Sequence, residues 1–280
     1  MTRLSDHLPP LRDVINRFGL RAKKSLGQNF LLDLNLTRKI ANTAGRLKET
    51  TVIEVGPGPG GLTRALLSSG AQRVIAIEHD PRCIEALSEI SQAYPNTLQI
   101  IEADALKVDI AALCPAPRQI IANLPYNIAT PLLIKWLRKT EDFEKLTLMF
   151  QKEVADRLTA KPRSKAYGRL SIIAQWLCHV EQEFDLSKEA FTPPPKVTST
   201  IVTLTPRRQP LAPAKWEILE KVTAAAFGQR RKMLRASLKA YNLDFVAMDL
   251  NETARAEELT VEMFCAIARA VENNRLLPDA

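Results

Sequence analysis

Cysteine and histidine are scarce in this chain of 280 residues, which has four of the former and three of the latter. The cysteines Cys83, Cys114, Cys178 and Cys265 lie at least 31 residues apart along the chain. No pair has the Cys-x-x-Cys spacing that begins a zinc site, and a disulfide framework needs more closely grouped cysteines. We therefore expect neither a metal centre nor a disulfide-stabilised fold.

Long hydrophobic runs are also missing. A membrane-spanning helix needs about 20 consecutive, mostly apolar residues, and the longest apolar stretches here, near Leu132–Ile134 and Val222–Phe227, are much shorter. The N-terminal residues contain no apolar core of the kind that signal peptides carry. With 46% hydrophobic and 25% charged residues, the composition is typical of a folded, soluble protein. We expect a cytoplasmic protein with no membrane partner.

Positive charge is in excess and is unevenly distributed, with a net charge of +8 at pH 7. Residues 1–40 hold eight basic and three acidic side chains, and residues 207–240 hold nine basic and two acidic ones. Residues 241–280 instead carry three basic and eight acidic side chains. Two separate basic blocks indicate a polyanionic partner such as a nucleic acid. Either block taken alone would more simply be a solvated face.

Short β-branched runs alternate with helix-like segments from Thr51 to Thr205, which is the pattern of repeated βαβ units around a mostly parallel sheet. The fold class is therefore predicted to be α/β. The predicted strands are 51–55, 73–78, 98–104, 119–123, 145–151, 180–186 and 197–205, and the predicted helices between them are 62–69, 81–94, 131–139, 152–159 and 169–177.

Three prolines between Thr205 and Pro213 end the last strand and prevent a helix from starting, which places a domain boundary there. Beyond it, hydrophobic residues follow a helical spacing and no strand pattern occurs, in segments 215–227, 230–241 and 260–274. We predict a basic N-terminal extension at 1–23, with a short helix pattern at 11–18, an α/β domain at 24–206 and a small all-helical domain at 207–280.

A glycine-rich turn follows the first predicted strand, with Gly56, Gly58 and Gly61 placed just before the next helix. Glycines let the backbone turn sharply and approach a ligand closely, and the helix N-terminus behind them offers free N–H groups. Glu78 ends the second strand 22 residues after Gly56, the spacing at which a carboxylate binds ribose hydroxyls in such folds. The turn predicts a nucleotide-type cofactor, and these residues alone suit NAD equally well.

Two further acids bear on the choice of cofactor. Glu54 completes the pattern Glu-x-Gly-x-Gly-x-Gly, which resembles the first motif of S-adenosylmethionine-dependent methyltransferases. Asp104 ends the third strand at the same edge of the sheet, where a carboxylate can accept a hydrogen bond from an adenine amino group. As a helix N-cap, Asp104 would have only a local role.

The fourth strand ends in Asn123-Leu124-Pro125-Tyr126, again at this edge. The tetrapeptide resembles the signature of enzymes that methylate an amino group conjugated to a ring. Because the lone pair of such a nitrogen is delocalised, the site must supply acceptors, and the Asn123 side-chain oxygen and the Leu124 carbonyl can each take an N–H. Pro125 fixes the backbone, and Tyr126 offers an aromatic face to a flipped-out base. A hydride-transfer enzyme has no use for this tetrapeptide.

A proline-rich segment, Phe191-Thr192-Pro193-Pro194-Pro195-Lys196-Val197, precedes the last predicted strand. Three consecutive prolines hold a stiff, extended loop, on which Phe191 is placed to cover the open face of the base and Lys196 to contact phosphate. A plain linker with a core phenylalanine explains this segment equally well when it is read alone.

These motifs occur in one order along the chain, starting with Ser25–Leu31 and continuing past the linker into Ala226–Arg235. Together, over essentially Lys24 to Leu238, they resemble the ribosomal RNA adenine N6,N6-dimethyltransferase family. The resemblance implies a Rossmann-like, seven-stranded methyltransferase domain that uses S-adenosylmethionine, followed by a small helical domain with a basic helix at 227–235. It further implies a monomer that dimethylates two adjacent adenines near the 3′ end of 16S rRNA, in the small ribosomal subunit or its precursor.

The resemblance also implies roles for individual residues. Cofactor contacts are expected at Asn29, Leu31, Gly56, Gly58, Glu78, Asp104 and Asn123. The expected catalytic residues are Asn123, Leu124, Pro125 and Tyr126, with Tyr126 and Phe191 stacking on the base. The residues expected to bind RNA are Lys23, Lys24, Lys196, Arg207, Arg208, Arg230, Arg231, Lys232 and Arg235.

Two other functions remain open. One is an adenine methyltransferase of the antibiotic-resistance type, which acts on large-subunit rRNA; the segment Phe227–Arg235 resembles the small-subunit enzymes more. The other is a non-catalytic RNA-binding assembly factor on the same scaffold, and the intact acceptors at Asn123 and Leu124 argue against it.

Overall fold

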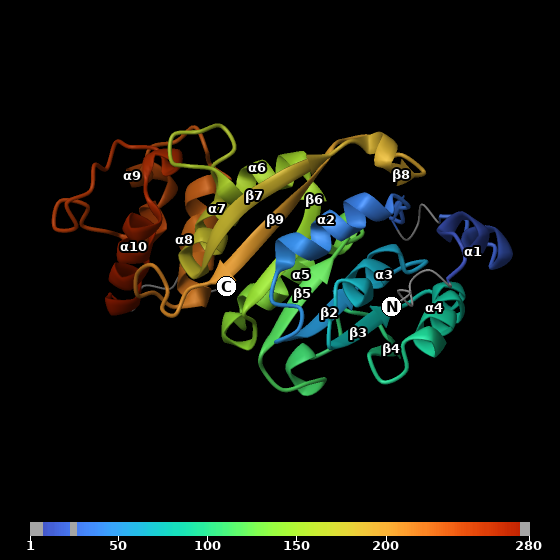
Figure 1. The fold of residues 1–280 in the computed structure, drawn as a ribbon. Coiled ribbons are helices and arrows are strands. Elements are labelled where there is room, and N and C mark those ends of the chain that lie inside the picture. The colour runs from blue at the N-terminus through green and yellow to red at the C-terminus, as the bar shows by residue number, and fades with distance from the viewer. Residues whose placement is uncertain (1–7, 23–26, 275–280) are drawn as a thin grey trace. The chain divides into compact units, whose positions relative to one another are not determined.

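The computed structural model describes residues 8–22 and 27–274, which form two compact units (Figure 1). The first, here called the sheet unit, contains the described residues up to Lys152 together with Glu181–Thr205. The second, here called the helical unit, contains Glu153–Val180 together with the described residues from Pro206 onward. The domain ranges predicted from the sequence assign Glu153–Val180 to the first domain instead, and they remain a prediction.

A seven-stranded sheet with the order β4-β3-β2-β5-β6-β9-β7 runs through the sheet unit. Neighbouring strands from β4 to β6 are parallel, whereas β9 runs antiparallel to β6. The strand order reverses between β2 and β5, and open α/β sheets bind ligands at the carboxyl ends of the strands beside such a reversal. The bounds are β2 Thr51–Val55, β3 Arg73–Glu78, β4 Leu98–Glu102, β5 Arg118–Ala122, β6 Lys145–Gln151, β7 Cys178–Leu186 and β9 Ser199–Pro206.

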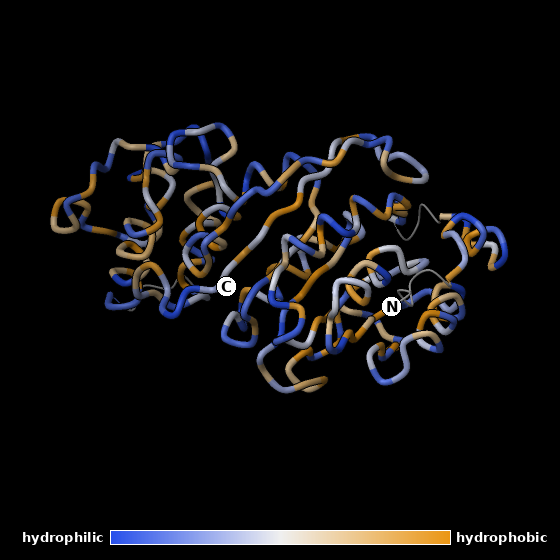
Figure 2. Tube along the Cα trace, viewed as in Figure 1, coloured by the Kyte–Doolittle hydropathy of each residue, from blue (hydrophilic) through white to orange (hydrophobic). Residues whose placement is uncertain are grey.

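Helices α2 and α4 each bury one face in the sheet unit, whereas α3 is buried along almost its whole length. In Figure 1, α2 lies in front of the sheet, and it packs against α3 and β6. Strands β2 and β5 are buried along almost their whole length, as expected of parallel strands covered on both faces, and Figure 2 draws the central strands mainly in hydrophobic colours. The bounds are α2 Leu34–Ala44, α3 Gly61–Ser68, α4 Pro81–Ala93 and α5 Tyr126–Leu137.

The N-terminal segment folds back onto the sheet unit. Helix α1 (Leu11–Arg17) and the residues after it place Val14 and Leu20 in a small hydrophobic cluster with Phe30 and with Cys83 of α4. Phe30 also begins the two-residue strand β1 (Phe30–Leu31), which pairs antiparallel with β8 (Phe191–Thr192). The segment that contains Phe30 is therefore held from both sides.

The helical unit is built around aromatic side chains. Tyr167 contacts Phe227 edge to face, with ring centroids 6.2 Å apart, and Phe227 stacks on Phe264 at 5.6 Å. Trp176 lies 6.2 Å from Trp216. Helices α7, α8 and α10 thereby share one core. The bounds are α6 Lys152–Thr159, α7 Arg169–Leu177, α8 Trp216–Gly228, α9 Leu234–Ser237 and α10 Val261–Asn273.

The structure confirms the predicted fold class and corrects two helices. Helix α5 begins at Tyr126 rather than at Pro131, which lies inside the helix. The helix predicted at 230–241 is wrong, and so is the continuous basic helix implied at 227–235. Helix α8 ends at Gly228, residues 229–232 form turns and a bend, and within 233–241 only α9 and a short 3-10 helix follow. The backbone N–H of Leu234 donates to the Ala254 carbonyl, 2.8 Å away, so a contact distant in sequence redirects the chain.

Among the described residues, no helix combines the length and the apolar character that crossing a lipid bilayer requires.

Candidate active site

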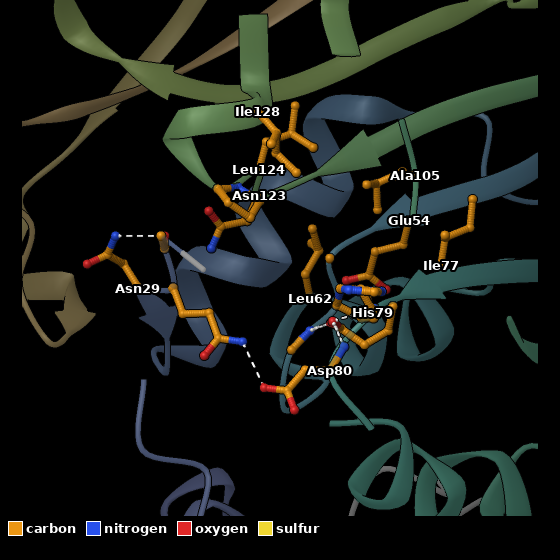
Figure 3. A pocket seen from close by; sticks show the side chains of 18 of the residues that line it. Asn29, Glu54, Leu62, Ile77, His79, Asp80, Ala105, Asn123, Leu124 and Ile128 are labelled. Carbon is orange, nitrogen blue, oxygen red and sulfur yellow. Dashed lines mark hydrogen bonds between the residues drawn. The ribbon is translucent and has the colours of Figure 1, made fainter. Parts of the chain in front are cut away.

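A cavity of about 300 Å³ opens at the carboxyl edge of the central strands (Figure 3). Its wall consists mainly of the ends of four neighbouring strands and the segments that follow them, together with the chain just before and within β1. These segments come from the sheet unit alone. Most of the wall residues belong to 27–31, 54–62, 77–80, 103–106 and 123–128.

The glycine turn is tied to Glu78 across the top of the sheet. One Glu78 carboxylate oxygen accepts the Gly58 N–H at 3.0 Å, and the other accepts the N–H groups of His79 and Asp80 at 2.8 and 2.9 Å. Gly58 has φ +56°, and a Cβ there would lie 3.1 Å from the Phe30 ring. A side chain at Gly58 would therefore be strained and crowded, so the turn needs glycine to keep its shape over the cavity.

Glu54 is a buried acid at the floor of the cavity. The residue is 1% exposed, and its carboxyl group accepts a hydrogen bond from the Thr63 hydroxyl at 2.7 Å. Burial raises the pKa of Glu54 to about 8, and the nearby Glu78 acts in the same direction. Loss of hydration disfavours a charged carboxylate, so Glu54 is protonated over most of the pH range below neutrality.

The segment Gly27–Leu31 forms one wall of the cavity. The Gln28 amide donates to the Asp80 carboxylate at 3.2 Å, and the Asn29 amide donates to the Gly27 carbonyl at 3.3 Å (Figure 3). Asp80 is also paired with Arg82, which lowers the pKa of Asp80 to about 2. An ionised Asp80 thus anchors the segment at ordinary pH.

Asp104 lies on a loop that a lysine holds in place. Asp104 lines the cavity and accepts the Leu106 N–H at 3.0 Å. The Lys135 ammonium group, on α5, donates to the carbonyls of Ala105, Leu106 and Val108 at 3.1, 2.7 and 2.6 Å. An ammonium group has three donors, and all three are used here. Lys135 therefore fixes the backbone that carries Asp104.

The tetrapeptide Asn123–Tyr126 connects β5 to α5 and faces the cavity. The Asn123 side chain projects into it (Figure 3), half-buried, and makes no hydrogen bond with any other described residue. The Leu124 carbonyl likewise accepts no hydrogen bond within the described parts of the chain. The Tyr126 hydroxyl lies 2.6 Å from the Ser199 hydroxyl, and Ser199 is fully buried. Two acceptors thus stand unused beside an aromatic ring of fixed orientation.

Every residue expected from the sequence to contact the cofactor lines this one cavity, as do all four expected catalytic residues. Phe191 does not line it. Its side chain is 2% exposed in the hydrophobic cluster of the sheet unit, opposite Leu31 in the β1–β8 pair. A stacking role for Phe191 would require β8 to move, and it remains a prediction.

The expected RNA-binding residues differ in their surroundings. Lys23 and Lys24 lie outside the described residues. Lys196 and Arg208 are exposed, and Arg207 is held by the Gln175 carbonyl and the His179 ring, at 3.1 and 2.9 Å. Arg230 and Arg235 form ion pairs with Glu257 and Glu252, whereas no ion pair to another described residue involves Arg231 or Lys232. Their contacts with RNA remain predictions.

Sequence reasoning missed several residues of the site because they act through contacts distant in sequence. Asp80 has a recognisable local pattern, an Asp before Pro at a helix start, which indicates an N-cap but not its contact with Gln28. Nothing in the spacing of Lys135 or Ser199 indicates a partner in the site.

Within 8–22 and 27–274, no group of three or more His, Cys, Asp or Glu side chains is arranged to hold a metal ion.

Comparison with known proteins gives a consistent family. The family model described as ribosomal RNA adenine dimethylase matches residues 19–273. The chain is 63% identical over 270 residues to the ribosomal RNA small subunit methyltransferase A of Rhodospirillum rubrum, covering 95% of this chain and 94% of that protein. It is 62% identical over 275 residues to the protein of the same name from Paramagnetospirillum magneticum, covering 96% and 97%.

Two solved structures share the fold. A dimethyladenosine transferase from Plasmodium falciparum superposes with a TM-score of 0.77 at 26% identity, covering 87% of this chain and 98% of that one. The 23S rRNA methyltransferase ErmE superposes with a TM-score of 0.67 at 27% identity, covering 87% and 100%. Both similarities extend beyond the sheet unit, since they cover more of this chain than that unit contains.

Proposed function

The chain belongs to the ribosomal RNA adenine dimethylase family, and from this we propose that it dimethylates N6 of two adjacent adenines near the 3′ end of 16S rRNA. The methyl donor is S-adenosylmethionine, and the substrate is the small ribosomal subunit or its precursor. One observation carries the proposal: a single cavity brings the glycine turn, Glu78 and Asp104 together with the unused acceptors of Asn123 and Leu124. We propose a monomeric enzyme that acts in the cytoplasm, where ribosomal subunits assemble.

The residues of the cavity fit such a cofactor. A carboxylate has about four acceptor sites, and Glu78 uses three of them on backbone N–H groups, so one is left for a ribose hydroxyl. Asp104 supplies a further acceptor for an adenine amino group. Ile77 and Leu106 add apolar surface for the adenine faces. When bound, S-adenosylmethionine supplies an electrophilic methyl group.

The tetrapeptide can activate a poor nucleophile without a general base. The N6 lone pair of adenine is delocalised into the ring, and two acceptors on its hydrogens favour a tetrahedral nitrogen with a localised lone pair. The Asn123 oxygen and the Leu124 carbonyl are such acceptors. Tyr126 provides a stacking face, and its hydrogen bond with Ser199 sets the plane of the ring. A duplex or stacked adenine must flip out to enter.

The proposal is tested by incubating undermethylated small subunits with the chain and labelled S-adenosylmethionine, and then mapping the labelled nucleotides. We expect label at two adjacent adenines near the 3′ end of 16S rRNA. Label on large-subunit RNA would favour the antibiotic-resistance type of activity instead. Tight binding of small subunits without transfer would favour a non-catalytic assembly factor.

Lys135 gives a prediction about the cofactor. Replacing it with Met removes three hydrogen bonds to the loop after β4 and keeps an unbranched apolar stem of similar length. We expect the loop that carries Asp104 to loosen, and the Kd for S-adenosylmethionine, measured by calorimetry, to rise about tenfold, which corresponds to roughly 1.4 kcal/mol.

The matched control is Lys139→Met, four residues further along the chain, where the ammonium group pairs with the exposed Asp109. Such exposed pairs contribute little, so its Kd should stay near that of the unaltered chain. An equal Kd in both variants would show that Lys135 does not position the Asp104 loop.

A further inference from the structure

The segment Lys161–Arg169, here called the basic loop, joins α6 to α7 in the helical unit. It contains four basic residues and no acidic one: Lys161, Arg163, Lys165 and Arg169. All four are exposed, and none forms an ion pair with another described residue. In Figure 2 the loop is drawn in hydrophilic colours over most of its length. None of the residues expected from the sequence to bind RNA lies in it.

The backbone of the basic loop is firmly held, although its cations form no ion pair within 8–22 and 27–274. Tyr167 is 1% exposed and packs edge to face on Phe227. The Arg163 N–H donates to the Glu257 carbonyl at 2.6 Å, which holds Arg163 at φ +69°. A residue other than glycine is uncommon in this conformation, so the contact fixes a specific loop shape.

Arg230 is the second anchor of the basic loop. Its guanidinium group donates to the Lys165 carbonyl at 2.7 Å and to the Glu257 carboxylate at 2.8 Å. Glu257 lies in the 3-10 helix η7 (Ala256–Glu258), which packs against α8. One arginine therefore clamps the loop to η7, and it does so through the loop backbone, which leaves the Lys165 ammonium group free.

We propose that the basic loop binds the phosphate backbone of the RNA substrate, and that Arg230 acts as a positioning residue that holds this surface in shape. The proposal rests on the proposed function, because it takes the RNA as the polyanion. A merely solvated run of charge needs no fixed backbone. A loop ordered before binding loses less conformational entropy when it meets its partner, and unpaired cations release counterions from phosphates.

The first test compares two matched double variants of the whole chain. Lys161→Gln with Lys165→Gln removes two charges from the basic loop. Lys221→Gln with Lys239→Gln removes two exposed charges elsewhere in the helical unit. Binding to undermethylated small subunits is measured over a range of salt concentrations. We expect the slope of log Kobs against log salt to fall by about 1.4 to 1.8 for the loop variant, at roughly 0.7 to 0.9 per lost contact, and to stay unchanged for the other.

Equal slopes for the two double variants would overturn the proposal, because the loop charges would then act only through the general field of the protein. Calorimetry with S-adenosylmethionine separates this failure from that of the proposed function. If the slopes are equal but both variants bind the cofactor and label 16S rRNA like the unaltered chain, the proposal for the basic loop fails and the proposed function stands. If the unaltered chain labels no small-subunit RNA, the proposed function fails.

The second test uses Glu257→Gln, which removes a negative charge near the proposed RNA surface. Simple electrostatics predicts tighter RNA binding for this variant. The clamp predicts the opposite, because Arg230 loses its charged partner and the loop loses its fixed shape. We expect Kd for small subunits to rise several-fold, with the unfolding temperature compared to exclude global loss of structure. Tighter binding would show that Arg230 does not act through the loop. Tyr167→Phe is the control: it keeps the ring and removes a buried hydroxyl that makes no hydrogen bond to any residue the structure describes, so this variant should bind like the unaltered chain.

Discussion

Replacing Asn123 with Ala should reduce methyl transfer by about 100- to 1,000-fold, the size of effect seen when one aligned polar group is removed from a transition state. The variant deletes one of the two acceptors that face the adenine amino group and leaves the Leu124 carbonyl. The Asn123 side chain is half-buried and makes no hydrogen bond within the described residues, so its loss should cost little stability. Single-turnover transfer of labelled methyl groups to small subunits measures the effect.

Calorimetric titration with S-adenosylmethionine is the companion measurement, because Asn123 is also predicted to contact the cofactor. We expect Kd to change far less than the transfer rate. Asn123→Asp keeps acceptor oxygens at the same place and should recover part of the rate. Transfer at the original rate in Asn123→Ala would overturn the acceptor mechanism, and a parallel loss of cofactor affinity would make Asn123 a binding residue alone.

The sequence predicts the sheet well because the buried parallel strands form short apolar runs with clear ends. Strands 51–55, 73–78 and 145–151 are found at the predicted bounds. The carboxyl ends of parallel strands meet at one edge of a sheet, so motifs that end separate strands are predicted to lie together. For this reason the glycine turn, Glu78 and Asn123 can be assigned to one site from the sequence alone.

Helix α5 shows where local preference fails. Proline is favoured in the first turn of a helix, which predicts a start at Pro131. The helix instead begins five residues earlier, and Pro131 forfeits one interior hydrogen bond. Burial of Leu132, Leu133 and Trp136 on the inner face of the same helix offsets this loss. Packing of this kind depends on tertiary contacts, which the hydrophobic periodicity of the sequence does not predict.

The parts of the site that sequence could not predict depend on single long-range contacts. The β1–β8 pair joins two residues near position 30 to two near 191, and no hydrophobic period marks a two-residue strand. The Lys135 contacts and the Tyr126–Ser199 hydrogen bond are of the same kind. The break in the predicted 230–241 helix also comes from such a contact, between Leu234 and Ala254.

Glu54→Gln should abolish most of the pH dependence of stability between pH 5 and 8. In the folded chain the pKa of Glu54 is about 8, because the group is buried, whereas an exposed glutamate titrates near pH 4.3. The folded state therefore holds a proton that the unfolded state releases over this range. The stability that protonated Glu54 gives the folded chain is fully present below the pKa that this residue has in the unfolded chain. It is lost as the pH rises through the pKa of Glu54 in the folded chain. For the unaltered chain, this one group lowers the free energy of unfolding by on the order of 4 kcal/mol from pH 5 to 8.

The glutamine variant keeps the size of the side chain and an oxygen that accepts from the Thr63 hydroxyl, but it has no proton to lose. Urea unfolding at pH 5, 6.5 and 8 should show similar stability for variant and unaltered chain at pH 5, and a more stable variant at pH 8. Glu102→Gln, at the exposed end of β4, is the matched control and should follow the unaltered chain. Asp80 does not confuse the result, because its pKa of about 2 places its titration below this range. Parallel pH curves for Glu54→Gln and the unaltered chain would show that Glu54 stays ionised, and that the cavity floor is more polar than its burial implies.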